Sequence, residues 1–211
     1  MNPVFKRPFQ ISDKDILYRI CQQTALAGED ASHVFKDVKL LGDIYVGPYL
    51  VYQPELVWVM EDEEGICGYL LAAENTPAYQ NWFEQKWLPK IREGRVCPNF
   101  EGNDLSPDES LLASLFDFSI YRPGWMLQFP AHFHIELLPR IQGKGVGTRC
   151  INDLCSLLIK RGCQGVHLGM HPENHQALKF YQKLGFQVLE HADLCWEEVL
   201  YLGKNLKPGR F

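Results

Sequence analysis

The sequence feature that most constrains this chain is the glycine-rich stretch at 142–148, which reads Gln-Gly-Lys-Gly-Val-Gly-Thr. An alternating run of apolar residues precedes it at 132–138, and an amphipathic segment follows at 146–159. Alternation is the period of a strand, whereas apolar residues three and four apart indicate a helix. Glycines in such a turn leave the backbone open, so N–H groups at the positive end of the helix dipole can face an anion. The stretch therefore predicts a phosphate or pyrophosphate site.

Two common phosphate loops do not fit the spacing. A dinucleotide-binding loop needs G-x-G-x-x-G early in a βαβ unit, with an acidic residue about twenty residues later. Here the glycines fall as G-x-G-x-G, and no acidic residue stands at a strand end near Gly162. A Walker loop needs G-x-x-x-x-G-K followed by Ser or Thr, which the chain lacks. The remaining pattern, Q-x-x-G-x-G, is by itself also compatible with a plain connection between strand and helix.

The composition excludes several classes of protein. The chain of 211 residues has a net charge of −5 and 46% hydrophobic residues, which is ordinary for a soluble domain and supplies no basic field for nucleic acid. No run reaches the roughly eighteen apolar residues of a membrane helix, and the N-terminus lacks the apolar core of a signal peptide. We therefore expect a single cytoplasmic domain at 1–211, with the nucleus as the alternative location. Neither nucleic acid nor a membrane is an expected partner.

Seven cysteines are scattered along the chain, and none forms a C-x-x-C pair. An odd number without regular spacing favours reduced thiols over a disulfide framework or a zinc site. Cys150 and Cys155 lie within an apolar helical pattern, where a thiol packs as a small hydrophobic group. We expect both to be buried and the protein to hold no metal.

Periodicity, caps and turn residues predict the order of the elements. They are a strand at 5–11, helices at 12–24 and 33–41, a strand hairpin at 56–72, helices at 79–93 and 106–118, a strand at 131–138, a helix at 146–159, a strand at 166–170, a helix at 174–184 and a hairpin at 186–202. Ser12 and Ser106 are expected helix caps, whereas Gly42-Asp43 and Gly47-Pro48 are expected breaks. The order predicts an α/β fold, a mixed sheet with helices on its faces, with a helical insertion at about 75–129.

Two side-chain clusters have ordinary explanations. The four acidic residues at 61–64 occupy the turn of the first hairpin, where we expect them to solvate the loop tip. Metal ligation is the alternative, but no second acidic cluster completes a site. Trp82 and Trp87, on the aromatic stripe of the insertion, are expected in the core or covering it, and Pro89 is expected to kink or end that helix.

Two segments resemble the GNAT superfamily of acyl-CoA-dependent N-acyltransferases. Residues 137–148 (LLPRIQGKGVGT) are similar to the family's central strand, pyrophosphate loop and helix. Residues 174–186 (NHQALKFYQKLGF) are similar to its N-x-x-A-x-x-x-Y-x-x-x-G-F segment. Two linked motifs in the family's order, over about a third of the chain, are more specific than a glycine turn. The resemblance implies a mostly antiparallel sheet of six to seven strands and transfer of an acetyl group from acetyl-CoA to a primary amine by direct attack in a ternary complex.

Residues 59–69 (VMEDEEGICGY), together with 18–21 and 180–185, resemble the acetyltransferase-like domain at the C-terminal end of animal O-GlcNAcases. That domain is regarded as a pseudo-acetyltransferase, because it lacks a proper CoA-binding loop. This chain departs from it by carrying the full loop at 142–147. The departure favours an active enzyme, and a catalytically silent binding or interaction module is the alternative.

The resemblance implies roles for individual residues. The backbone of Leu137 and Leu138 pairs with the pantetheine arm, and Asn174 bonds the same arm. Backbone N–H groups cradle the pyrophosphate at Gln142, Gly143, Lys144, Gly145, Val146, Gly147 and Thr148. Ala177 and Phe180 line the CoA groove. Tyr181 acts as the general acid that protonates the departing thiolate, since a phenol with a pKa near 10 is suitably matched to a thiol near 8.5.

An attacking amine also needs a base, because it is protonated at neutral pH. His132 and His134 lie two residues apart on one face of the expected strand, and imidazole titrates in the useful range. This strand resembles the paired-histidine strand of serotonin N-acetyltransferase, although both rings could also merely cover the polar face of the sheet or be satisfied in a core. Glu136, on the same face, is a weaker candidate.

The spacing of His167, His171 and His175 does not indicate a metal site, since these residues straddle a strand, a turn and a helix. The acceptor is left open among a small amine, an amino sugar, a peptide and a protein lysine. A monomer and a homodimer are both compatible with the sequence.

Overall fold

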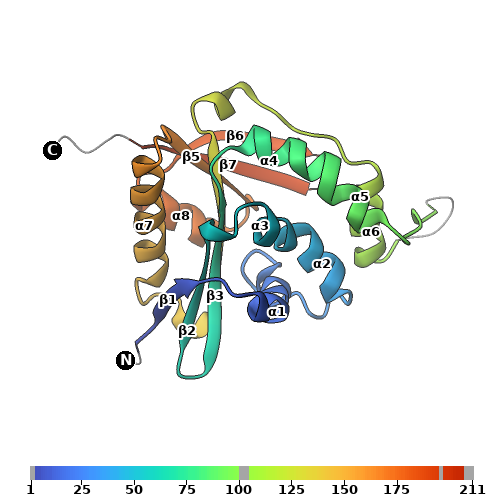
Figure 1. The fold of residues 1–211 in the computed structure, drawn as a ribbon, viewed down its shortest axis with the longest axis horizontal. Helices are drawn as coiled ribbons and strands as arrows, with labels where there is room; N and C mark the ends of the chain where they lie inside the picture. Colours follow the sequence, from blue (N-terminus) through green and yellow to red (C-terminus); the bar gives the residue numbers. More distant parts are fainter. Residues whose placement is uncertain (1–2, 100–104, 195–196, 207–211) are drawn as a thin grey trace.

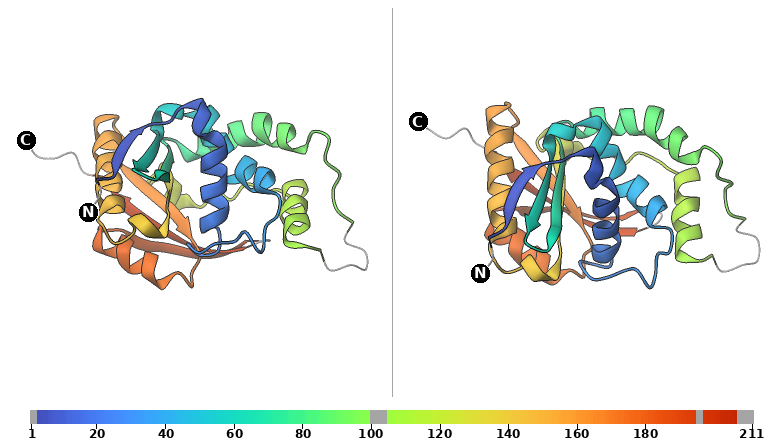
Figure 2. Two further views of the ribbon diagram at one scale, coloured as in Figure 1. Left: turned by 90° about the horizontal axis from the view of Figure 1, so that it is seen from below. Right: turned by 60° about the horizontal axis from the view of Figure 1, so that its bottom comes forward.

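The computed structural model describes residues 3–99, 105–194 and 197–206 of the 211-residue chain. Its strands form one seven-stranded sheet in the order β1-β2-β3-β4-β5-β7-β6. Helices α1 to α6 cover one face of this sheet, and α7 and α8 cover the other, as Figures 1 and 2 show. Among the described strands, every neighbouring pair is antiparallel except β4 with β5. The expected mixed, mostly antiparallel sheet flanked by helices is confirmed.

The first part of the chain supplies three strands and the helices that cover them. The elements are β1 (Phe5–Pro8), the 3₁₀ turn η1 (Ile11–Asp13), α1 (Lys14–Thr24), α2 (Val38–Tyr45), α3 (Gly47–Tyr52), the 3₁₀ turn η2 (Pro54–Leu56), β2 (Val57–Asp62) and β3 (Gly65–Ala73). The first helical turn is not capped at Ser12 as expected. Instead, the carboxylate of Asp13 accepts the backbone N–H of Gln10 at 2.8 Å and closes the turn.

The expected break at Gly42-Asp43 is wrong, because both residues lie inside α2. A Cβ on Gly42 would lie 2.1 Å from Cδ2 of Tyr18, so glycine is what allows α2 to pack closely on α1. The Tyr18 hydroxyl donates to Asp43 Oδ1 at 3.0 Å across the same contact. Gly47-Pro48 likewise begins α3 rather than a turn, since the first turn of a helix tolerates proline.

The insertion packs its aromatic stripe onto the sheet. It contains α4 (Thr76–Trp82), the π-helical turn η3 (Phe83–Trp87), α5 (Leu88–Arg92), α6 (Pro107–Phe116) and the 3₁₀ turn η4 (Gly124–Leu127). The irregularity expected at Pro89 takes the form of the π turn just before α5. Ser106 caps α6 as expected, and Glu109 completes a capping box. Trp87 is 8% exposed and donates its Nε1–H to Asp43 O at 2.7 Å, which confirms its place in the core.

The second part of the chain supplies the remaining strands and the helices of the opposite face. The elements are β4 (Ala131–Leu137), the 3₁₀ turn η5 (Pro139–Ile141), α7 (Val146–Lys160), β5 (Gly165–Met170), α8 (His175–Lys183), β6 (Gln187–Leu194) and β7 (Glu197–Asn205). Cys150 and Cys155 of α7 are 3% and 6% exposed, so their expected burial is confirmed. The six described cysteines are free thiols, and Cys195 lies outside the described residues. None of the described helices is long and apolar enough to cross a membrane.

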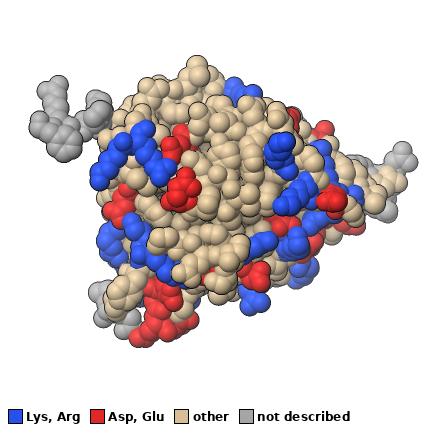
Figure 3. Space-filling model, viewed as in Figure 1, with Lys and Arg blue, Asp and Glu red and all other residues tan. Residues whose placement is uncertain are grey.

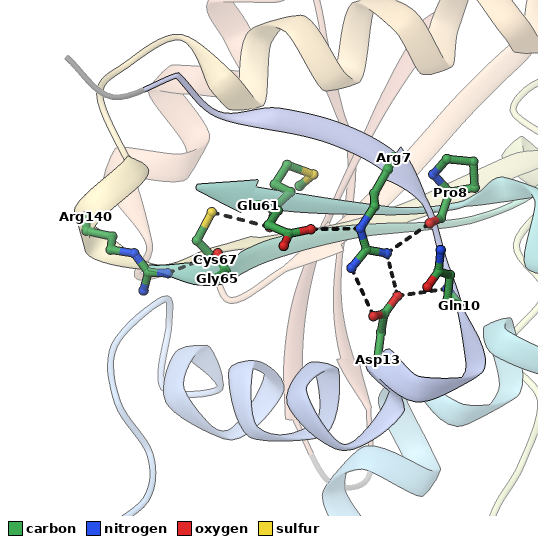
Figure 4. Close-up of polar contacts among 9 residues, drawn as sticks. Arg7, Pro8, Gln10, Asp13, Glu61, Gly65, Cys67 and Arg140 are labelled. Carbon is green, nitrogen blue, oxygen red and sulfur yellow. Dashed lines mark hydrogen bonds and ion pairs between the residues drawn. The ribbon is translucent and has the colours of Figure 1, made fainter. Parts of the chain in front are cut away.

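The β2–β3 hairpin ends in an acidic tip, which Figure 3 shows at the lower left of the molecule. Two of its four acidic residues do more than solvate the turn. Arg7 Nε donates to Glu61 Oε2 at 2.8 Å, and Arg140 Nε donates to Asp62 Oδ2 at 3.0 Å. Figure 4 shows Arg7 reaching Glu61 from β1 and Arg140 reaching the hairpin from η5. The expectation that the tip is simply solvated is therefore wrong for Glu61 and Asp62.

Candidate active site

The sheet opens at its only described parallel pair. β4 and β5 pair at two positions, and the second joins His132 to His167. Beyond it, β4 continues to Leu137 paired with β3 alone, and β5 continues to Met170 paired with β7 alone. We call the gap between these two diverging strand ends the slot. Because backbone N–H and C=O groups require partners, the slot suits an extended ligand that adds to the edge of β4.

The backbone of β4 offers alternate groups to the slot. The N–H of Leu138 donates to Cys67 O on β3 at 2.9 Å. Successive residues of an antiparallel strand turn their N–H and C=O groups to opposite neighbours, so those of Leu137 point into the slot. The Leu137 carbonyl also accepts from Gln142 Nε2 at 2.8 Å, which ties the glycine loop to the strand end. The N–H of Leu137 thus faces a ligand in the slot, whereas that of Leu138 is taken by β3.

The glycine loop lies where β4 ends and α7 begins. Gly143 and Gly145 have φ angles of +68° and +73°, a conformation that glycine adopts without steric cost. Gly145 is the N-cap of α7, and no described side chain caps this helix. The first N–H groups of α7 therefore lack intrahelical partners at the positive end of the dipole. A Cβ on Gly147 would lie 3.2 Å from Cζ of Phe180, so α8 packs against this turn. This is the geometry that an anion site at a helix N-terminus requires.

His132 is 7% exposed, and both of its ring nitrogens have partners. Nδ1 lies 2.7 Å from Thr76 Oγ1, and Nε2 lies 2.6 Å from the hydroxyl of Tyr49. Thr76 donates its own proton to Pro130 O at 2.8 Å, so Thr76 accepts from His132 Nδ1–H. Nε2 then accepts from the Tyr49 hydroxyl. Burial lowers the pKa of His132 well below its ordinary value, so the ring is a neutral, fixed part of a buried network.

His134 and Glu136 follow on the same strand face and are partly exposed. Among the described residues the His134 side chain makes no hydrogen bond, and its ring lies 5.4 Å from that of Tyr49. Burial lowers the pKa of His134 to about 4 and raises the pKa of Glu136 to about 7. A hydrogen bond with Thr24 opposes the rise at Glu136. At neutral pH, His134 is therefore uncharged and Glu136 is close to half ionised. A carboxyl whose pKa lies near the working pH suits the role of a general base.

Tyr181 projects from α8 and is partly exposed. Its ring centroid lies 6.2 Å from that of Phe133 on β4 and 5.7 Å from that of Phe186. Burial raises the pKa of Tyr181, and the charge of Glu136 raises it further. Tyr181 therefore stays protonated through the physiological range, as a proton donor must.

Asn174 caps α8, as the sequence predicted, with Oδ1 accepting the N–H of Ala177 at 3.0 Å. Its Nδ2 donates to Ala27 O at 2.7 Å. Ala27 has a φ of +51°, in the left-handed region that few non-glycine residues adopt. The amide of Asn174 therefore joins the loop after α1 to the start of α8, and its expected bond to pantetheine stays a prediction.

Sequence reasoning missed His167 as a neighbour of the histidine pair. Its ring lies 5.6 Å from that of His132, and its Nδ1–H donates to Phe129 O at 2.7 Å. The alternation of Val166, Leu168 and Met170 already places His167 on the polar face, so the signal was present. His171 and His175 lie outside this strand. No group of three or more His, Cys, Asp or Glu residues that could hold a metal occurs among the described residues.

Known proteins share both the motifs and the fold. The family model described as the acetyltransferase (GNAT) family matches residues 119–186, which include β4, the glycine loop and α8. The crystal structure of SsHAT superposes with a TM-score of 0.81 at 32% identity, covering 97% of this chain and 99% of that one. The chain belongs to the GNAT acetyltransferase family.

Other matches place this GNAT chain among longer and more distant relatives. Protein O-GlcNAcase of Mus musculus is 26% identical over 202 residues, which cover 95% of this chain and 22% of that protein. The chain thus spans about a fifth of the length of the curated relatives it matches. The structure of yncA from Salmonella typhimurium with its cofactor acetyl-CoA has a TM-score of 0.55 at 15% identity, covering 100% of this chain and 98% of that one. This last likeness concerns the fold alone.

The GNAT family model matches only part of the candidate site. It ends at residue 186, before β6, and it begins at 119, after α1 to α6. The slot, the glycine loop and Tyr181 fall within the matched residues. The elements that surround the strand face of His134 lie largely outside them, so the family match carries no information about the acceptor.

Proposed function

We propose that this chain transfers an acetyl group from acetyl-CoA to a primary amine by direct attack in a ternary complex. The observation that carries the proposal is the slot between β4 and β5. The glycine loop lies at the end of β4, and Glu136, His134 and Tyr181 stand around the slot with perturbed pKa values. Titratable groups shifted in this way cluster at catalytic sites. Membership of the GNAT family supports the same reaction.

The residues that are present fit a pyrophosphate and an extended arm. The loop and the uncapped first turn of α7, with Gly143 and Gly145 in the left-handed conformation, supply N–H donors from Gly143 to Thr148. The N–H of Gln142, which the sequence also suggested, already donates to Pro139 O at 3.2 Å. The N–H of Leu137 faces the slot. Phe180 packs beside Gly147 at the start of α7, and Ala177 lies one turn before Phe180 on α8. These residues would hold acetyl-CoA, which when bound supplies a thioester carbonyl to be attacked.

We assign the general base to Glu136, with His134 as an uncharged neighbour. Glu136 has a pKa of about 7 and is partly exposed, so it can take a proton from an ammonium group and then release it. His134, as a neutral ring, can accept a hydrogen bond from the bound amine. His132 is less suited to proton transfer, because Thr76 and Tyr49 occupy both of its nitrogens. Tyr181 keeps its proton and donates it to the departing thiolate.

Two measurements on the purified chain test the proposal. Isothermal titration with acetyl-CoA should show saturable binding, and a thiol-release assay with a panel of primary amines should show turnover. Absence of binding at millimolar acetyl-CoA would overturn the proposal. Binding without turnover of any amine would favour the second candidate.

That second candidate is a catalytically silent GNAT module that binds acetyl-CoA or a partner protein. It is favoured by the match to O-GlcNAcase over 95% of this chain, since the resembling domain there is regarded as a pseudo-acetyltransferase. The glycine loop argues only against the form that binds a partner protein and no CoA, because such a module would not need two left-handed glycines at an uncapped helix start.

A further inference from the structure

The two faces of the sheet differ beside the slot. On one face, α7 and α8 cover the strands, and Phe133 is 1% exposed among their side chains. On the other face, beneath α1 to α6, His134 and Glu136 keep part of their surface exposed, so we expect the amine to reach the slot on that face. The side chains next to the slot on that face determine which amine fits.

Strand register places an aromatic surface beside the slot. His132 pairs with His167, so Gly169 lies level with His134 across the slot. Gly169 pairs with Tyr201 on β7, whose ring covers it: a Cβ on Gly169 would lie 3.3 Å from Cε1 of Tyr201. The ring of Tyr201 thus covers Gly169 together with Val199, whose Cγ1 would lie 2.9 Å from such a Cβ.

A β-bulge turns a carboxylate toward the same surface. The register of β6 and β7 shifts between Val188 and Glu190, so that Glu190 pairs with Tyr201. In a regular ladder, Leu189 would pair with Tyr201, and Glu190 would face the opposite side of the sheet. The extra residue therefore turns the side chain of Glu190 to the face that carries Tyr201, as β-bulges near functional sites commonly do.

Aromatic donors fix that carboxylate. Trp125 Nε1–H donates to Glu190 Oε2 at 2.7 Å, and the Tyr121 hydroxyl also bonds Glu190. Both bonds lower the pKa of Glu190, so it is ionised at neutral pH. The ring centroid of Tyr201 lies 5.0 Å from that of Trp125 and 5.8 Å from that of Tyr121. All four side chains are partly exposed. An anionic group framed by aromatic faces is the chemistry that recognises a cation.

Building on the proposed acetyl transfer, we propose that the acceptor carries a second positive charge, and that Glu190 with the rings of Tyr121, Trp125 and Tyr201 binds it. The reacting nitrogen must be uncharged when it attacks, so the bound cation is a different group of the same molecule. Glu190 lies two strands beyond β5, which is about 10 Å at the usual strand spacing. The simplest such acceptor is a diamine, with an uncharged amine at the slot and a cation about 10 Å beyond β5.

Diaminooctane and octylamine are matched probes, since only the first carries a distal ammonium at about this separation. Titration calorimetry with CoA present should show diaminooctane binding at least about tenfold more tightly than octylamine, and the thiol-release assay should show the same preference in kcat/KM. Glu190→Gln keeps a side-chain oxygen for Trp125 but removes the charge. It should weaken the binding of diaminooctane to the level of octylamine and so abolish the preference.

Glu198→Gln is the control, because Glu198 belongs to the same hairpin and its ion pair among the described residues is with exposed His191 at 3.4 Å. This control variant should still bind diaminooctane more tightly than octylamine. Equal binding of the two amines to the unaltered chain, or a preference that survives in Glu190→Gln, would overturn the inference. Because binding is measured separately, that result is distinct from a failure of the proposed acetyl transfer, which would appear as absent turnover.

Discussion

Three polar residues of β4 share one face, yet their surroundings give them different chemistry. His132 makes two hydrogen bonds, the His134 ring makes none within the described part of the chain, and Glu136 is a carboxyl whose pKa is raised to about 7. Position on the strand is thus a poor guide to the base. The number of partners and the cost of desolvation decide which group can exchange a proton.

Because of Glu136, activity and stability should change in opposite directions as the pH rises. Folding raises its pKa from 4.5 to about 7, so the folded state favours the protonated carboxyl. The contribution of this group to the free energy of unfolding is therefore full below pH 4.5 and is lost as the pH rises through about 7. Over the upper part of this window kcat/KM should rise, because the base becomes ionised. Rate profiles and urea unfolding at several pH values check both trends, and Glu136→Gln should flatten them. A profile unchanged by the substitution would remove Glu136 as the base.

Tyr181→Phe should lower kcat about a hundredfold or more, the usual contribution of a general acid. The dissociation constant of acetyl-CoA should change little, because the ring that packs on Phe133 is kept. Steady-state kinetics and calorimetry on the same preparation separate the two effects. Normal turnover would exclude the proposed role of the hydroxyl.

His132→Ala should lower the free energy of unfolding by about 2–4 kcal/mol, because the buried hydroxyls of Tyr49 and Thr76 lose a partner. His134→Ala is the matched control. It removes the same side chain two residues away, where the ring has no hydrogen bond among the described residues, and should cost less. Urea unfolding measures both variants. If His132→Ala were fully stable yet inactive, His132 would be a catalytic group after all.

At the scale of elements, the glycine loop is held from two sides. Gln142 bonds the end of β4, and Arg140 of η5 bonds the β2–β3 hairpin through Asp62. Arg140 Nη2 also lies 3.4 Å from the carbonyls of Gly65 and Ile66, so η5 is attached to both the side chain and the backbone of the hairpin. A hairpin more than seventy residues earlier in the chain therefore helps to position the expected anion site.

Asp62→Ala should raise the KM for acetyl-CoA up to about fivefold and leave kcat unchanged, since it loosens the loop without touching the slot. Glu64→Ala is the matched control, because Glu64 contacts Arg140 only at 3.9 Å and its side chain is 69% exposed. Initial-rate measurements at varied acetyl-CoA test the difference. Identical KM values for the two variants would show that the ion pair does not position the loop.

At the scale of the whole molecule, the sheet is two halves that meet at a weak seam. β1 to β4 form one half and β5 to β7 the other, and the strands of the seam pair at only two positions. The core beneath α7 spans both halves and holds them together. A ligand in the slot would add backbone hydrogen bonds where the sheet lacks them.

Acetyl-CoA should therefore stabilise the whole fold. At a hundredfold excess over the dissociation constant, mass action adds about 2.7 kcal/mol to the free energy of unfolding. Thermal unfolding at rising ligand concentration measures this as an increase in Tm. Gly145→Val should suppress it, because a β-branched residue is strained at a φ of +73° and crowds the loop. A ligand shift of normal size in this variant would contradict the assignment of the loop.

Local sequence determined much of this protein, because the relevant chemistry acts over a few residues. The alternation of β4, the caps at Ser106 and Asn174 and the left-handed glycines of the loop follow from backbone and side-chain geometry within one turn. The two motifs sufficed to predict the family. The expected break at Gly42 was wrong. Gly42 lies inside α2, where Tyr18 of α1 packs so closely that only glycine fits.

Only the tertiary structure decided the states of the site residues. The two partners of His132 lie 83 and 56 residues away in sequence, and Trp125 lies 65 residues from Glu190. Such contacts, and the burial that shifts the pKa values of Glu136 and His134, arise only when distant segments pack. The sequence thus named the candidate residues of the donor site, which stay a prediction, whereas their protonation, their partners and their exposure depend on long-range packing.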